Sequence, residues 1–100
     1  MQEKIERITQ MERNLDQLAE AAKALSAALD QYAEAQSAVY ALGAYLSSGA
    51  WSEDNETDEA GLLPENLKRG VLSQDGIWNV MNDCHELDIR MLEMVTSRMR

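Results

Sequence analysis

Apolar side chains recur along the first half of the chain in alternating steps of three and four residues. This apolar stripe runs through twelve positions: Ile8, Met11, Leu15, Leu18, Ala22, Leu25, Leu29, Tyr32, Gln36, Val39, Gly43 and Leu46. Residues at this spacing lie on one face of a slightly underwound helix, as in a coiled coil or a helix-bundle seam. Gln36 and Gly43 are the two departures from apolar character. The stripe predicts one long helix over about residues 2–47.

The composition favours the same fold class. Ala, Leu, Glu and Gln are frequent, Phe is absent, and the only proline is Pro64. Such side chains lose little rotamer freedom in a helix. Ala is dense between residues 19 and 44, on both sides of the stripe, so a partner helix can approach closely. Gly49 can adopt the left-handed conformation that closes a helix C-terminus. We expect an all-α protein.

An acidic connector is expected over residues 48–72. It contains a run of like charges, Glu53, Asp54, Glu56, Asp58 and Glu59. Like charges repel one another and stay solvated, so the run predicts a loop. Pro64 suits the first turn of a helix and Gly70 suits the position after its end, so one short helical turn is expected over about residues 64–69.

A second long helix is expected over about residues 74–99. Ser73 can act as its N-cap by accepting a hydrogen bond from the amides of Asp75 or Gly76, and Asp75 suits the positive end of the helix dipole. Its apolar face comprises Ile77, Val80, Met81, Cys84, Leu87, Met91, Met94 and Val95.

Two long helices joined by a connector are expected to form one antiparallel helical hairpin, a single domain over residues 1–100. The first helix would be roughly 65 Å long and the second about 39 Å, so part of the stripe would lack a partner. A second copy of the chain could cover it, making a homodimer with a four-helix bundle. We call the expected contact the association seam: Ile8, Met11, Leu15, Leu18, Leu25, Leu29, Tyr32 and Gln36.

The charge and the cysteine content restrict the partners and the compartment. A net charge of −9 repels phosphate backbones and anionic headgroups, so neither nucleic acid nor a membrane is an expected partner. The largely apolar stretch 38–46 is too short to span a bilayer. Cys84 is the only cysteine, and residues 1–15 do not resemble a signal peptide. A cytoplasmic protein is the expectation.

Three segments resemble a known family. They are the opening Ile5-Glu6-Arg7-Ile8-x-x-Met11-Glu12, the turn at 58–61 and, most specifically, Leu63-Pro64-Glu65-Asn66-Leu67-Lys68-Arg69-Gly70-Val71-Leu72-Ser73-Gln74-Asp75-Gly76. Together they resemble the bacterial family catalogued as domain of unknown function 4298, and the likeness covers nearly the whole chain. The resemblance implies a small helical bacterial protein, but it implies no activity and no site residues.

No catalytic, cofactor or metal site is expected. Asp54, Glu56, Asp58 and Glu65 match positions 1, 3, 5 and 12 of an EF-hand-like loop, but position 6 is Glu59 where that loop needs glycine. Cys84 and the adjacent His85 point about 100° apart on a helix and cannot easily share a metal ion.

Three residues of the connector are candidates for partner contacts: Lys68, Arg69 and Trp51. Lys68 and Arg69 are the only bases between Lys23 and Arg90. Two interpretations remain open for them. They could pair with Glu65, Asp75 or the acids of 53–59 and so hold the connector in place, or they could contact an acidic partner or a phosphate.

The function expected from these features is that of a non-enzymatic, self-associating interaction or scaffold protein, with an unidentified protein partner as a further possibility. One alternative is an acidic decoy that occupies a basic protein surface through residues 53–59. Another is an enzyme with an unrecognised carboxylate site between the helices of the dimer. Salt-sensitive binding would distinguish the decoy from apolar helix pairing.

Overall fold

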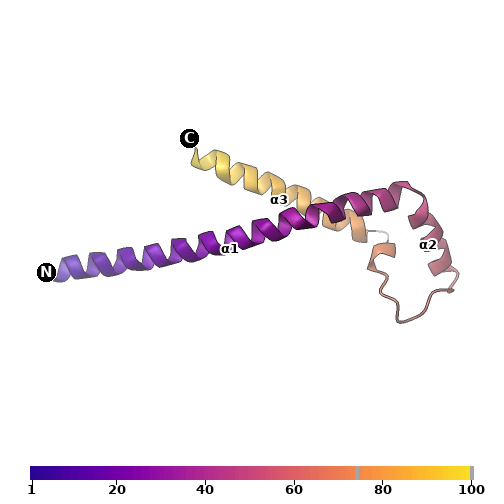
Figure 1. Cartoon of the computed structure of the whole chain (residues 1–100), viewed down its shortest axis with the longest axis horizontal. Helices are drawn as coiled ribbons and strands as arrows, with labels where there is room; N and C mark the ends of the chain where they lie inside the picture. Colours follow the sequence, from indigo (N-terminus) through magenta and orange to yellow (C-terminus); the bar gives the residue numbers. More distant parts are fainter. Residues whose placement is uncertain (74, 100) are drawn as a thin grey trace. The chain divides into compact units, whose positions relative to one another are not determined.

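The computed structural model describes residues 1–73 and 75–99. These residues form four helical elements in the order α1 (Gln2–Ser47), α2 (Ala50–Glu59), the 3₁₀ helix η1 (Gly70–Leu72) and α3 (Gly76–Arg98), as Figure 1 shows. No strand occurs in the described residues. The all-α prediction is confirmed, and so is the long N-terminal helix.

The bounds of α1 agree with the sequence prediction at both ends. No glycine or proline interrupts the first 42 residues, and the helix stops two residues before Gly49. Gly49 has φ 87° and ψ −11°, the left-handed conformation expected of it. A residue with a Cβ is strained there, which explains why the chain turns at this point into α2.

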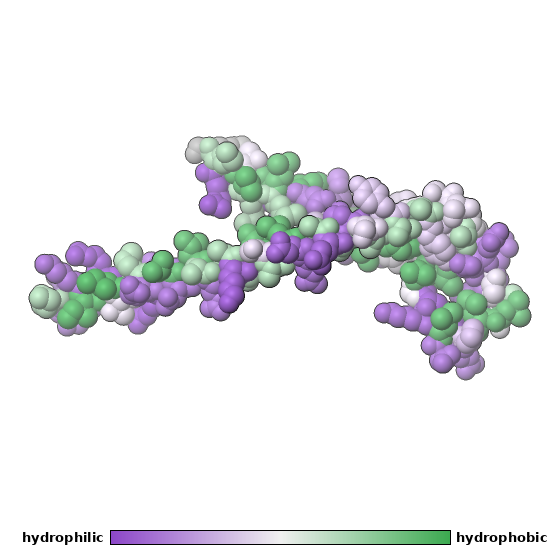
Figure 2. Space-filling view, viewed as in Figure 1, coloured by the Kyte–Doolittle hydropathy of each residue, from purple (hydrophilic) through white to green (hydrophobic). Residues whose placement is uncertain are grey.

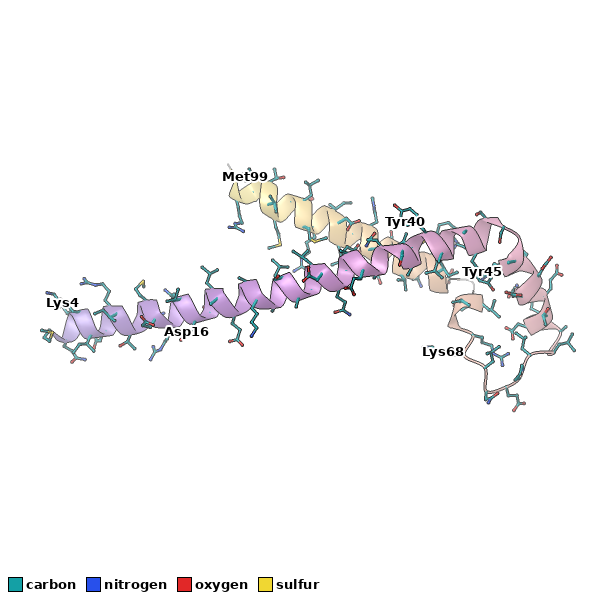
Figure 3. All side chains as sticks on the ribbon, in the orientation of Figure 1. Lys4, Asp16, Tyr40, Tyr45, Lys68 and Met99 are labelled. Atoms are coloured by element: carbon teal, nitrogen blue, oxygen red, sulfur yellow. The ribbon has the colours of Figure 1, made fainter. Side chains whose placement is uncertain are left out.

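The chain divides into two units, Met1–Ser37 and Ala38–Arg100. The first unit is helical from Gln2 onwards, and every residue from Met1 to Gln31 is exposed. Its side chains project freely around the helix, Lys4 and Asp16 among them (Figure 3). Apolar and polar groups lie next to each other along it (Figure 2). No tertiary packing therefore covers this stretch.

The second unit contains the end of α1 together with α2, η1 and α3. η1 contacts both α2 and α3, and α3 runs in the opposite direction to the end of α1 (Figure 1). Ile77 in the first turn of α3 is 5% exposed, the one fully buried apolar side chain among the described residues. The core of this unit is accordingly small and centred on the junction of η1 and α3.

The prediction of a solvated loop at 53–59 is wrong, because these residues lie in α2. A helix keeps most of the like charges in water just as a loop does: Glu53, Asp54, Glu56 and Glu59 are all exposed. The inward face is marked by Trp51, Asn55 and Asp58, which are half-buried at helical spacing. Repulsion between the like charges therefore does not prevent a helix here. The helical spacing of the three half-buried residues is the sequence feature that agrees with α2.

The short helical turn expected over about residues 64–69 is present only in part and belongs to no helix. Its residues form a single hydrogen-bonded turn, in which the Leu67 amide donates to the Pro64 carbonyl oxygen at 3.2 Å, and the 3₁₀ helix comes later. The reason lies in Arg69. Its guanidinium donates to the carbonyl oxygens of Pro64 (2.6 Å) and Leu67 (3.4 Å), so these carbonyls are hydrogen-bonded without a continuing helix.

The N-cap prediction for Ser73 is likewise wrong. The Ser73 hydroxyl donates to the Gly70 carbonyl oxygen at 2.9 Å, which secures η1 rather than α3. Asp75 is the residue that caps α3, and it does so without a side-chain hydrogen bond. The predicted start at residue 74 lies outside the described residues, and the helix itself begins at Gly76.

Candidate interaction surface

The association seam lies on the exposed surface of the first unit. Its first six residues have exposed fractions between 45% (Leu29) and 70% (Leu18), and they comprise Ile8, Met11, Leu15, Leu18, Leu25 and Leu29. The last two, Tyr32 and Gln36, are half-buried. The Gln36 side-chain amide donates to the Tyr32 carbonyl oxygen at 3.2 Å. The structure thus brings large apolar side chains into water in a continuous row.

The row follows a strict seven-residue repeat. With Ile8 at position a and Met11 at position d, every later member of the stripe falls on a or d. The flanking e and g positions from residue 19 to 35 are small, namely Ala19, Ala21, Ser26, Ala28, Ala33 and Ala35. From residue 13 to residue 34 the charged side chains all lie at b or f, away from the row. The surface is therefore apolar, broad and free of charge along most of its length.

The second unit holds its connector in place with side-chain hydrogen bonds. The Trp51 indole donates from Nε1 to the Val71 carbonyl oxygen at 2.8 Å, which ties α2 to η1. The Tyr45 hydroxyl donates to Asp54 Oδ2 at 2.5 Å, which ties α1 to α2. The hydrogen bond to Asp54, reinforced by partial burial and by the carboxylate charge, raises the pKa of Tyr45 above its ordinary value of 10.0.

Arg69 joins three parts of the connector. It forms an ion pair with Asp58 of α2 while donating to the Pro64 and Leu67 carbonyls. Arg69 and Trp51, two of the predicted partner contacts, therefore bond within the chain. Lys68, the third, is exposed and has no ion pair in the part of the chain that is described (Figure 3). The sequence indicated Arg69 and Trp51 as candidate contact residues. It could not indicate their acceptors at Pro64 and Val71, because these are backbone carbonyl oxygens, which every residue has.

Replacing Arg69 with Ala should lower the free energy of unfolding of the second unit by about 1–3 kcal/mol, because a hydrogen-bonded, charge-assisted pair with Asp58 is lost. Lys68→Ala is the matched control and should change stability by less than about 0.5 kcal/mol. Urea denaturation followed by tryptophan fluorescence measures both. Equal losses for the two variants would contradict the assignment of the stabilising contact to Arg69.

An apolar cavity of about 420 Å³ lies where the end of α1, η1 and the start of α3 meet. Its lining residues are Leu42, Lys68, Gly70, Val71, Gly76, Ile77 and Val80. Gly76 lies where α3 approaches η1 most closely. A Cβ placed there would lie 2.5 Å from the Gly70 carbonyl oxygen and 2.5 Å from Ser73 Oγ. The start of α3 can therefore approach η1 only with glycine at this position.

No metal-binding arrangement occurs among residues 1–73 and 75–99, since no three His, Cys, Asp or Glu side chains converge there. Asp54 and Asp58, two members of the EF-hand-like pattern, lie on α2 and accept from Tyr45 and Arg69. Cys84 is half-buried on α3 and forms no disulfide. In the described part of the chain, the helices are too short or too polar to traverse a lipid bilayer.

Comparison with known proteins gives a family but no described relative. The family model named Domain of unknown function (DUF4298) matches residues 8–94. No curated protein and no solved structure matches the chain. The matched range begins at the first residue of the association seam and extends to the last turns of α3, so it covers most of each unit. The chain therefore belongs to the DUF4298 family, the family that the 63–76 segment of its sequence resembles.

Proposed function

We propose that this protein is a non-enzymatic, self-associating interaction or scaffold protein of the bacterial cytoplasm, and that the association seam of α1 binds a second copy of the chain. The observation that carries the proposal is the exposure of Ile8, Leu15, Leu18 and the other apolar seam residues in the described chain. Monomeric proteins rarely expose a continuous apolar surface of this kind without a use for it.

The period of the stripe supports a helix as the partner. An isolated α-helix has 3.6 residues per turn, so a row with an exact seven-residue repeat drifts about 20° per heptad around it. The row stays on one face only when the helix supercoils around another helix. This stripe keeps its period from Ile8 to Leu46 without a stutter. A second copy supplies a helix with the same repeat, so each seam can cover the other.

Light scattering on the full chain tests the proposal. At micromolar concentration the expected mass is about twice that of the 11.2 kDa chain, and raising the salt concentration should leave it unchanged because the contact is apolar. A monomer mass throughout the concentration range would overturn the proposal.

A second candidate function is the acidic decoy. It is favoured by the exposed acids of α2, which place Glu53, Glu56 and Glu59 in water on one short helix. A decoy would bind a basic protein surface with an affinity that falls steeply with salt. Titration with a basic protein such as histone at two salt concentrations separates the two candidate functions. A decoy should bind the basic protein with an affinity that falls with salt, whereas a protein that only self-associates should not bind it.

A further inference from the structure

The stripe of α1 also carries information about how the two copies are oriented. Building on the proposed function, we infer that the second copy binds antiparallel to the first through residues 4–36, with the pair centred on residue 20. The partner is thus a second α1 in one register, and the contact lies entirely within the first unit, in which Met1–Gln31 are exposed and Tyr32 and Gln36 are half-buried.

The polar positions of the stripe determine the register. One step before Ile8 the stripe reaches Lys4, which is exposed, and its first polar member after that is Gln36. In an antiparallel pair each a residue faces a d residue of the other copy. Centring on residue 20 places Lys4 against Gln36 at both ends. A slip of one heptad either way instead places Lys4 against Leu29 or Gln36 against Met11.

The functional groups at these two positions are complementary. The Gln36 amide nitrogen already donates to the Tyr32 carbonyl, so its side-chain oxygen is left to accept a further hydrogen bond. Lys4 carries three N–H donors and no acceptor. In a parallel pair Lys4 would face Lys4, and two like charges would meet in the seam. In the antiparallel pair the Lys4 ammonium can therefore donate a hydrogen bond to Gln36, whereas in the parallel pair it would face a second ammonium.

The sizes of the side chains between these ends also match. Ala22 is the one small residue in the middle of the stripe, and in this register it faces Leu18 of the second copy. A parallel pair would set Ala22 against Ala22 and leave a gap, which is unfavourable in a packed core. The full set of layers is Lys4 with Gln36, Ile8 with Tyr32, Met11 with Leu29, Leu15 with Leu25, and Leu18 with Ala22.

The flanking positions permit a close approach at the centre. Ala19 at e and Ala21 at g each meet their own counterpart across the two-fold axis, and neither side chain keeps the helices apart. One pair of charges favours the opposite orientation, since Arg7 at g would reach Glu12 at e of a parallel copy. Such ion pairs are exposed and contribute little compared with the layers of the seam.

The orientation has a measurable consequence. In the antiparallel pair the axial separation of equivalent residues grows by about 3 Å for every position away from residue 20, whereas in a parallel pair it is zero everywhere. Residue 23 would lie about 9 Å from its counterpart along the axis, and residue 34 about 42 Å.

Pulsed electron–electron resonance on singly spin-labelled full-length chains tests this. Lys23→Cys, Gln17→Cys and Glu34→Cys, each with Cys84→Ala, place one label per chain on the outward b, c and f positions. We expect similar distances for residues 17 and 23, and a distance at least about 15 Å longer for residue 34. A dimer giving equal distances at all three sites would overturn the antiparallel pairing alone, and unequal distances at 17 and 23 would overturn the register. A monomer by light scattering would overturn the proposed function itself.

Discussion

Replacing Leu18 and Leu25 with glutamate should convert the dimer to a monomer, raising the dissociation constant at least about 1,000-fold. Each dimer loses four leucines from its contact, and burial of each contributes on the order of 1–2 kcal/mol. The four carboxylates that replace them would have to be desolvated without a partner, which adds to the loss. Analytical ultracentrifugation over a range of concentrations measures the change.

The matched control adds the same charges elsewhere on the same helix. Ala24 and Ala27 lie at c and f, are exposed, and do not belong to the stripe. The double variant Ala24→Glu with Ala27→Glu should remain a dimer, because glutamate is a good helix former and the seam is intact. If both double variants dissociate equally, net charge rather than the seam governs association, and the assignment of the contact to Leu18 and Leu25 is wrong.

Gly76→Ala should lower the free energy of unfolding of the second unit by about 1–3 kcal/mol. The new Cβ would lie 2.5 Å from the Gly70 carbonyl oxygen. That oxygen already accepts from the Ser73 hydroxyl at 2.9 Å, so it cannot move without breaking the bond that secures η1. Trp51 and Trp78 both lie in this unit, and their fluorescence during urea denaturation reports its unfolding.

Gly43→Ala is the control for this prediction. Gly43 lies inside α1, and a Cβ at that position would meet nothing within 4 Å. Alanine should therefore stabilise the helix by about 0.5–1 kcal/mol. The two Gly→Ala changes are predicted to have opposite signs. A stabilising effect of Gly76→Ala would show that η1 and the start of α3 are not held as closely as the structure indicates.

The long helix could be predicted to the residue because its signals are local. Helix-forming side chains, the absence of proline and the left-handed Gly49 all act within a few residues of the boundary they determine. The same holds for the family resemblance, which depends on a contiguous segment. Antiparallel packing of the two long helices as one hairpin, and the dimer, involve contacts between distant residues and remain predictions.

Residues 50–72 were harder to predict because their conformation depends on non-local acceptors. Trp51 bonds to a carbonyl twenty residues away, and Arg69 bonds to Asp58 and to the backbone of Pro64. The Pro64 carbonyl oxygen accepts from Arg69 and from the Leu67 amide, so it is hydrogen-bonded without the i+4 amide that a longer helix would supply. Of the two interpretations left open for Arg69, the structure contains the internal pairing with an acid of the 53–59 run.

The exposure of every residue from 1 to 31 has a further consequence. In a single chain this stretch of α1 is held by local interactions alone, and amide hydrogens in such a helix exchange readily because it frays from its free end. Binding of a second copy stabilises the helical state of this stretch, and the stabilisation increases with the concentration of the protein. Hydrogen exchange over residues 2–31 should therefore slow as concentration rises, while exchange within α3 stays constant. The concentration of the protein would then determine how much of the exposed part of α1 is helical at any moment.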